Sequence, residues 1–319
     1  MKIHTVSEYL KQQYGQKIYK LSLSSGCTCP NRDGTLNYGG CTFCSEGGSG
    51  EFAQVIRDPE EIDTEIEKAR QRVLAKLPGN RPPDRQKFIA YFQSFTNTYG
   101  ETGRLRDLYR GVLQRDDVVI LSIGTRPDCI DDDKLQLLRE LNAIKPVWVE
   151  LGLQTIHDTT AERIHRGYPT RIFHECFRRL KEAGLTVVVH VILGLPGESE
   201  CDMLETVRYL GSLRPLPDGI KLQMLNILKG TQLAEEYERS PFLQMSIEDY
   251  CRLVVKCLQL LPEDVVIHRM TGDGPRNLLI SPRWVTDKKR VINTLRGAIE
   301  AADRMEQMDR CSCSSGGMG

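Results

Sequence analysis

The segment KIYKLSLSSGCTCPNRDGTLNYGGCTFCSEGGSG, residues 17–50, contains the two features that decide the fold. Its first part, KIYKLSLS (17–24), is a β-rich run that predicts a strand. The remainder, residues 26–50, is a loop rich in glycine and cysteine. A strand that leads into such a loop, before a helical pattern, predicts the first unit of an α/β fold with chemistry at the carboxyl end of its strands.

Strand-like runs recur along the next two hundred residues. Five follow the first, namely KFIAYFQ (87–93), DVVILSIG (117–124), VWVELGL (147–153), TVVVHVIL (186–193) and GIKLQML (219–225). Amphipathic stretches that predict helices lie between them, at 58–76, 101–114, 132–142, 158–183 and 199–213. This alternation predicts a parallel sheet with crossover helices. Six such units predict an α/β fold with a partial or complete barrel.

The chain divides into four expected segments. These are an N-terminal segment (1–16), a barrel core (17–230), a C-terminal α/β extension (231–308) and a flexible tail (309–319). The extension contains a predicted helix at 246–261, a strand VVIHRM at 265–270 and a helix near 286–307. Small polar residues dominate the tail, so we expect Cys311 and Cys313 to be disordered rather than to bind a second cluster.

Composition excludes several classes of protein. The 319 residues carry 43 basic and 43 acidic side chains, so the chain lacks the overall positive charge that supplies non-specific affinity for nucleic acid. A nucleic-acid partner would need a local patch, and segments 163–181 and 283–296 contain clustered basic residues. No apolar run is long enough to span a membrane, and the N-terminus lacks a signal-like apolar core. We therefore expect a cytoplasmic protein.

Three of the eleven cysteines form a metal-binding pattern. Cys29, Cys41 and Cys44 have the spacing C-x11-C-x2-C within the glycine-rich loop. Three thiolates can hold a cubane cluster and leave one iron open for a ligand. Zinc is the chemical alternative, with Cys27 or a histidine as the fourth ligand, although structural zinc sites more often show two close pairs. Buried free thiols are the remaining reading.

Polar residues also lie on the predicted strands. Glu150, Gly152 and Gln154 share one face of their strand by period-two alternation, as do His190 with Ile192 and Lys221 with Gln223. In βα barrels the interior and the carboxyl ends of the strands form the site. These residues are therefore site candidates, and a hydrogen-bonded structural role is the alternative for each one.

The cysteine loop resembles the cluster-binding loop of radical S-adenosylmethionine (SAM) enzymes, in which an aromatic residue such as Phe43 often precedes the third cysteine. More narrowly, the chain resembles the YtqA/YhcC group, which is related to the elongator catalytic subunit. That match runs over nearly the whole chain, through LSIGTRPDC (121–129), VELGLQT (149–155), GLPGE (194–198), LKGTQLA (228–234) and HRMTGDGPR (268–276). The resemblance implies a partial (β/α)6 TIM-like barrel, with Cys29, Cys41 and Cys44 as ligands of a [4Fe-4S] cluster that cleaves SAM.

The resemblance also implies SAM-binding positions. Superfamily members usually have two glycines after the second strand, and this chain has Ser94 and Phe95 there, followed by Thr96. Gln154 and Arg166 match residues that contact the ribose and the carboxylate of SAM in the coproporphyrinogen-dehydrogenase-like branch, and a planar guanidinium suits a carboxylate. The GLPGE turn places Leu195 and Pro196 under adenine. We add Glu150 to this set.

We expect the HRMTGDGPR turn to contact the substrate through His268, Arg269, Asp273 and Arg276, with a structural turn held by Asp273 as the alternative. Relatives of the group imply a tRNA partner and modification of the wobble uridine, with conversion of 5-carboxymethylaminomethyl-2-thiouridine to 5-aminomethyl-2-thiouridine. A flavodoxin or ferredoxin would supply electrons. Radical chemistry on a small metabolite or peptide is one alternative, and a non-catalytic zinc or iron–sulfur protein is another.

Overall fold

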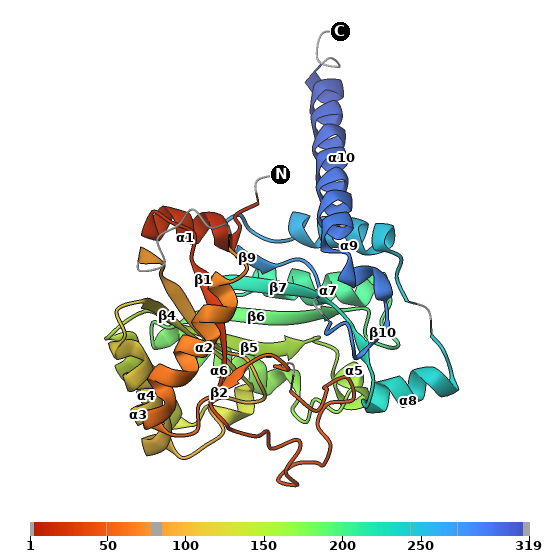
Figure 1. The fold of residues 1–319 in the computed structure, drawn as a ribbon. Coiled ribbons are helices and arrows are strands. Elements are labelled where there is room, and N and C mark those ends of the chain that lie inside the picture. Colours follow the sequence, from red (N-terminus) through yellow and green to blue (C-terminus); the bar gives the residue numbers. More distant parts are fainter. Residues whose placement is uncertain (1–2, 49, 78–84, 243, 273, 315–319) are drawn as a thin grey trace.

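The structure, a computed structural model, describes residues 3–48, 50–77, 85–242, 244–272 and 274–314. Its centre is a curved parallel sheet of eight strands in the order β2-β1-β3-β4-β5-β6-β7-β9 (Figure 1). The strands are β1 (Tyr19–Ser24), β2 (Gln54–Val55), β3 (Phe88–Phe92), β4 (Val118–Thr125), β5 (Val147–Gln154), β6 (Thr186–Leu193), β7 (Gly219–Met224) and β9 (Val266–Arg269). All six predicted core strands are confirmed, and the open sheet is a partial barrel.

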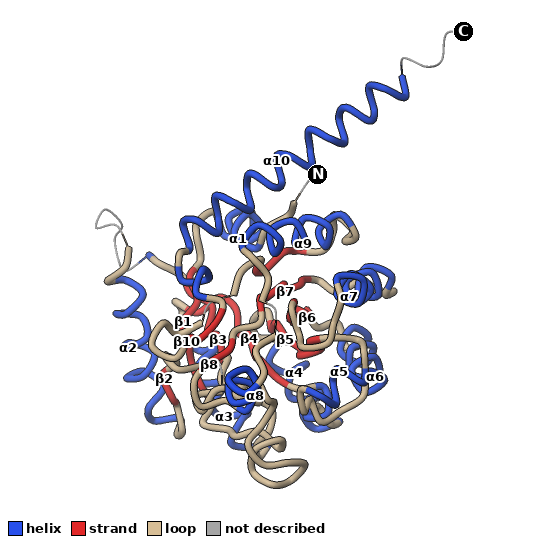
Figure 2. The backbone as a smooth tube through the Cα atoms, turned by 90° about the vertical axis from the view of Figure 1, so that its right-hand side faces the viewer, coloured by secondary structure: helices blue, strands red, loops and turns tan. Residues whose placement is uncertain are grey.

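Helices cover the outer face of the sheet, as Figure 2 shows from the side. They are α2 (Ile62–Leu74), α3 (Thr102–Gln114), α4 (Asp132–Asn142), α5 (Asp158–Arg163), α6 (Thr170–Glu182) and α7 (Glu200–Ser212). Strand side chains alternate between faces, so Leu21 and Leu23 are fully buried in the core beneath the helices. Lys20, the residue before Leu21, points to the opposite face and reaches Glu150 on the inner side of the sheet. The inner face is thus free to carry polar groups.

The region predicted as one helix at 158–183 contains two helices. Between α5 and α6 the backbone passes through His165 and Gly167, whose φ angles are 54° and 83°. Such left-handed conformations interrupt a right-handed helix. The prediction of a continuous helix was therefore wrong, and the break lets residues 164–168 approach the cysteine loop.

The N-terminal segment contains a helix that the sequence analysis missed. Helix α1 (Val6–Tyr14) begins with a capping box, in which the Thr5 hydroxyl accepts from the Glu8 amide and the Glu8 carboxylate accepts from the Thr5 amide. Leu10 of this helix joins a buried cluster with Ile18 and Trp148 from the strands. Helix α1 therefore packs against the inner residues near the amino-terminal ends of the strands.

The C-terminal extension is more closely integrated than we expected. Its strand β9 pairs in parallel with β7 and so extends the main sheet, rather than lying outside the βα units. The remaining elements are β8 (Ile227–Leu228), α8 (Gln232–Arg239), α9 (Ile247–Gln259), β10 (Leu279–Ser281) and α10 (Lys288–Ser314). Helix α10 projects from the body (Figure 1). It includes residues 309–314, which we had assigned to a flexible tail.

Within the described part of the chain, no helix combines the length and apolar character needed to cross a membrane.

Candidate functional site

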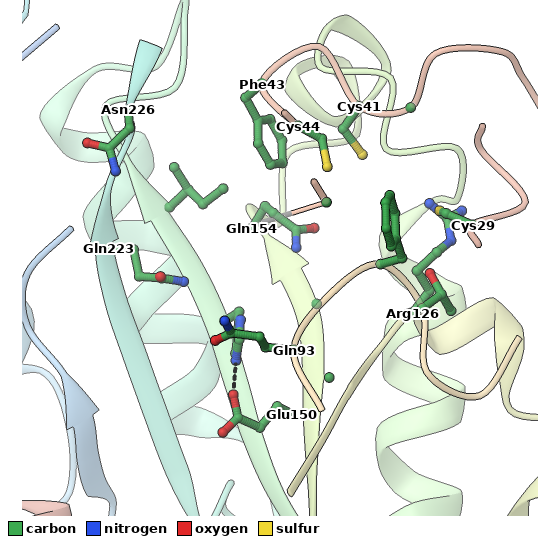
Figure 3. Close-up of a pocket in the computed structure, with 18 of the residues that line it drawn as sticks. Cys29, Cys41, Phe43, Cys44, Gln93, Arg126, Glu150, Gln154, Gln223 and Asn226 are labelled. Carbon is green, nitrogen blue, oxygen red and sulfur yellow. Dashed lines mark hydrogen bonds and ion pairs between the residues drawn. The ribbon is translucent and has the colours of Figure 1, made fainter. Parts of the chain in front are cut away.

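A cavity of about 280 Å³ lies over the inner face of the sheet. Cys29, Cys41 and Cys44 line one end of it, and Glu150, at mid-strand, lines its floor (Figure 3). Parallel strands all present their carboxyl ends at one edge, so side chains distant in sequence meet there. The predicted cluster ligands and the predicted polar strand face therefore share one site.

The cysteine loop is held against the barrel by polar contacts. The Asn31 amide donates to the carbonyl of His165 and lies 3.5 Å from the Cys41 sulfur. Arg32 donates to the carbonyls of Cys44 and Ser45. The Thr42 amide donates to the carbonyl of Ile164 at 3.0 Å, and these backbone and side-chain bonds fix the loop on the α5–α6 connection. A further contact, from the Phe95 amide to the Gly48 carbonyl, ties the loop to the turn after β3.

The thiols have environments that suit metal binding. Burial raises the pKa of Cys41 to about 12, and the neighbouring Cys44 thiol adds to that rise. Burial also raises the pKa of Cys44, against the positive charge of Arg32. A bound metal removes the proton from a coordinating thiol outright, so a raised pKa in the metal-free protein is no obstacle. Mutual electrostatic influence also shows that the thiols lie near one another.

The spacing of the sulfurs distinguishes a cluster from a single zinc ion. Three thiolates bound to one tetrahedral zinc at about 2.3 Å would lie about 3.8 Å apart. Among the described residues, only His157, Asp202 and Glu205 form a group of three with all ligand atoms within 4.8 Å, and the three cysteines are wider apart than this. The donor set therefore fits an iron–sulfur cluster better than a zinc ion. Cys27 lies outside the cavity lining, against Arg104.

The turn after β3 matches the backbone expected of a SAM site. Phe95 has a φ angle of 56°, a left-handed conformation that favours glycine. This is one of the two positions at which the family resemblance implies glycine, and its backbone has a conformation that glycine favours. Phe95 and Thr96 line the cavity, whereas Ser94 is buried beside it, with its hydroxyl 3.5 Å from the Gly50 carbonyl.

Gln154 reaches the cavity from a strained position at the end of β5. Its φ angle is 62°, and the pairing of β5 with β6 shifts register between Gly152 and Gln154. The bulge turns the side chain inward, where its amide oxygen lies 3.4 Å from the Tyr168 hydroxyl (Figure 3). Strain of this kind is typical of functional sites.

Arg166 belongs to the cavity lining, and its guanidinium is bound by acceptors of the protein itself. Only 1% of it is exposed, and its five N–H groups all donate within the protein. The acceptors are the carbonyls of Leu153, Thr155 and Tyr168, the Asp158 carboxylate and the Thr170 hydroxyl. In this arrangement Arg166 positions the end of β5 and the α5–α6 loop. Its contact with the SAM carboxylate stays a prediction, and it would require some of these bonds to rearrange.

Arg126 is a cavity residue that the sequence analysis did not single out. Its guanidinium lies 4.8 Å from the centre of the Tyr168 ring and forms an ion pair with Asp128 at 2.7 Å. Its positive charge also opposes the rise in the pKa of Cys41. The guanidinium lies beside the cysteine end of the cavity (Figure 3). The motif LSIGTRPDC contained it, and only its place at the end of β4 would have indicated a role.

The GLPGE turn lies close to the site but does not line it. Leu195 is buried in a cluster with Ile164 and Leu225, against which Phe43 packs. Neither Leu195 nor Pro196 belongs to the cavity lining. Their predicted place under adenine remains a prediction.

Three of the four predicted substrate residues lie in the described part of the chain, and the structure separates them. Arg269 lines the cavity and donates to Gln223 at 3.3 Å. His268 is on the same strand but packs on Trp148, with ring centroids 4.9 Å apart and outside the cavity lining. Arg276 is exposed and donates to the Thr286 carbonyl. Asp273 lies outside the described residues.

The cavity floor is a buried ionic network centred on Glu150. This carboxylate accepts from Ser122 at 2.8 Å and from His190 at 2.7 Å, and it pairs with Lys20 at 3.2 Å. Lys221 also donates to Glu150 and lies 3.0 Å from the Tyr91 hydroxyl. The position of Glu150 supports a role beneath the ligands, and our prediction that it contacts SAM remains untested.

Opposing effects set the charges of the network. Burial alone would raise the pKa of Glu150, but the charges of Lys20 and Lys221 and the His190 hydrogen bond hold that pKa well below its usual value. Burial lowers the pKa of His190 to about 4, and the charge of Lys221 adds to this. Glu150 is therefore ionised at neutral pH and His190 is neutral, with its Nε2–H donated to the carboxylate.

Two family models and several known proteins match most of the chain. A family model described as "Radical SAM superfamily" matches residues 26–210, and one described as "Radical_SAM C-terminal domain" matches residues 217–301. The uncharacterized protein YtqA of Bacillus subtilis is 40% identical over 297 residues, which cover 93% of this chain and 89% of YtqA. The protein YhcC of Escherichia coli is 37% identical over 280 residues, covering 88% and 86% of the two chains.

More distant similarities extend to other enzymes. The tRNA uridine(34) acetyltransferase of Methanocaldococcus infernus is 27% identical over 163 residues, 51% of this chain and 30% of that protein. The solved structure of the archaeal Elp3 from the same organism has a TM-score of 0.57 at 21% identity, covering 70% of this chain and 55% of Elp3. Methylornithine synthase (PylB) has a TM-score of 0.50 at 15% identity, covering 91% and 85%. These structures share the fold.

Proposed function

Because the chain belongs to the radical SAM superfamily, we propose that it modifies the side chain of the wobble uridine of tRNA. Members of this superfamily are enzymes that use a [4Fe-4S] cluster and SAM. Cys29, Cys41 and Cys44 would hold the cluster, since they line one end of a single cavity. When bound and reduced, the cluster supplies the electron that breaks the S–C5′ bond of SAM, and the radical so formed takes hydrogen from the substrate.

The protein residues bind, orient and shield the reactants. The backbone at Phe95 and the amide of Gln154 face the cavity and would position SAM. Arg166 holds the end of β5 in its strained shape through the carbonyls of Leu153 and Thr155. A reductant is also needed, and we propose flavodoxin or ferredoxin.

The tRNA proposal rests on one observation, the similarity to a tRNA uridine(34) acetyltransferase over half of this chain. Within that class of substrate, we propose conversion of 5-carboxymethylaminomethyl-2-thiouridine to 5-aminomethyl-2-thiouridine. This reaction would begin with hydrogen abstraction from the carbon next to nitrogen. Return of a second electron to the oxidised cluster would leave an imine, and water would cleave its C–N bond to give the aminomethyl product and glyoxylate. Similarity over 30% of the relative supports the substrate class, not the reaction.

Comparison of tRNA nucleosides by mass spectrometry tests the substrate. Cells without the gene should accumulate the carboxymethylaminomethyl form and lose the aminomethyl form. The wild-type gene should restore the normal profile, and a Cys41→Ala gene should not, because it lacks one cluster ligand. A wobble-uridine profile that is the same with and without the gene would exclude this substrate.

Radical chemistry on a small metabolite or peptide is the second candidate. The observation in its favour is the zero net charge of the chain, which gives no overall field for a polyanion. Binding of tRNA and of an unrelated RNA of similar length by the reconstituted enzyme separates the two candidates. A dissociation constant that does not distinguish tRNA from other RNA would favour the small substrate.

A further inference from the structure

Three cationic side chains lie around Glu150 and the neighbouring wall of the cavity. Arg269 on β9 lines the cavity, whereas Lys20 on β1 and Lys221 on β7 contact Glu150 below the lining, and the charges of Lys20 and Arg269 both act on Lys221. Among the described residues, Glu51 and Glu150 are the carboxylates that line the cavity. Glu51 lies at the cysteine end, where it accepts from Ser45, so Glu150 is the floor carboxylate.

Burial and the neighbouring positive charges disfavour the protonated form of Lys221. Only 2% of this residue is exposed, and burial lowers its pKa well below the usual value of lysine. The Glu150 carboxylate opposes that effect, but the charges of Lys20 and Arg269 add to it. An additional negative group near these cations would relieve their repulsion, and the attraction would be strong because a buried site screens charge poorly.

The geometry also provides donors for such a group. Arg269 and Gln223 both line the cavity, at the wall formed by β7 and β9. The Gln223 amide oxygen accepts from Arg269 at 3.3 Å, so the amide nitrogen is the part of Gln223 left to contact a ligand. Figure 3 shows the Gln223 side chain pointing from its strand into the cavity. A guanidinium beside an amide N–H is a donor set that suits a carboxylate.

We propose that Arg269 and Gln223 form a subsite for a carboxylate carried by the substrate, at the wall of the cavity formed by β7 and β9. The inference rests on the proposed function, because it assigns the carboxymethyl group of the substrate to this subsite. The substrate would then be a molecule that bears a carboxylate near the carbon from which hydrogen is taken.

The test uses a small probe with the reconstituted holoenzyme. N-methylglycine reproduces the end of a carboxymethylamino group, and N-methylglycinamide is its counterpart with an uncharged end. Calorimetric titration should show about tenfold tighter binding of the carboxylate form to the wild type, a difference of about 1.4 kcal/mol. The preference should disappear in Arg269→Gln.

Two further variants control for indirect effects. Arg276→Gln changes an exposed arginine in the same turn and should keep the wild-type preference. Gln223→Leu removes the second donor while keeping similar bulk and should weaken the preference, which keeps the test decisive if Arg269→Gln fails to fold. Equal binding of the two probes to the wild type would overturn the proposal, and so would a preference unchanged by Arg269→Gln or by Gln223→Leu.

Failure of this inference is distinct from failure of the proposed function. If tRNA nucleosides prove unchanged without the gene while the carboxylate preference holds, the substrate is another carboxylate-bearing molecule. If the nucleosides change but the preference is absent, the tRNA reaction stands and the subsite is wrong.

Discussion

Glu150 and His190, two of the residues inside the barrel, have lowered pKa values in the folded state, and both shifts have the same consequence for stability. His190 has a pKa of about 4 in the folded protein, against an ordinary value of 6.5, because it is buried and lies near Lys221. Between these values the unfolded chain binds a proton that the folded chain does not, so stability rises with pH across that window. Glu150, with its pKa held below the usual value of 4.5, adds a loss of stability in more acidic solution.

Acidification from pH 7 to pH 5 should therefore destabilise the protein through His190. The expected loss is about 1–2 kcal/mol in the free energy of unfolding, from the shift in the histidine pKa. Urea denaturation at the two pH values measures it. His190→Gln should reduce this dependence, while His268, whose pKa burial also lowers, should keep part of it; His174→Gln, which changes an exposed histidine, serves as the control. An unchanged pH dependence in His190→Gln would contradict the assignment.

The left-handed backbone conformation of Gln154 leads to a second prediction about a single residue. Its φ of 62° favours glycine, so Gln154→Gly should be more stable than Gln154→Ala by about 1 kcal/mol. Both variants remove the amide from the cavity, and both should weaken SAM binding to a similar degree. Thermal unfolding of the two variants side by side isolates the strain. Equal stability would show that this position is not strained.

At the scale of elements, the regular strands could be predicted from the sequence and the buried ionic network could not. Alternating patterns located the six core strands within one or two residues, because each strand buries one face under a helix. Glu150, His190 and Lys221 were identified as inner-face residues on the same argument. That they meet Lys20 and Tyr91 depends on strand order and register, which local patterns do not contain.

The sequence contains a recognisable start signal for helix α1. The sequence TVSE at 5–8 is a capping box, and the helix it starts is short enough that tertiary packing decides its stability. Thr5→Ala should destabilise the protein by about 1 kcal/mol, because the first turn loses its side-chain cap. Chemical denaturation measures the change. Ser7→Ala, inside the same helix at an exposed position, should have a smaller effect, and a larger effect there would argue against the cap.

The cysteine loop should depend on its anchors as well as its thiols. Asn31 is 1% exposed and donates to the His165 carbonyl, so Asn31→Ala should loosen the loop without removing a ligand. We expect iron to be lost to a chelator several-fold faster than from the wild type, because contacts around a metal site tune its affinity. Asn37→Ala, at an exposed position in the same loop, is the matched control. Equal rates of iron loss from the two variants would contradict a role for Asn31.

At the scale of the molecule, the sequence predicted the α/β architecture but not that the C-terminal region would add a strand to the main sheet. We expected a separate C-terminal extension, yet β9 joins the main sheet beside β7 and brings Arg269 into the cavity. His268 and Arg269 are successive residues of β9, so their side chains point to opposite faces of the strand. His268 thus packs on Trp148 while Arg269 reaches the site.

The central claim is that Cys29, Cys41 and Cys44 hold a cluster that cleaves SAM. Anaerobic reconstitution, reduction and quantification of 5′-deoxyadenosine test it most directly. The wild type and Cys27→Ala should both release this product, because Cys27 lies outside the cavity lining. Cys41→Ala should release none. Product formation by Cys41→Ala, or its absence from the reconstituted wild type, would contradict the account.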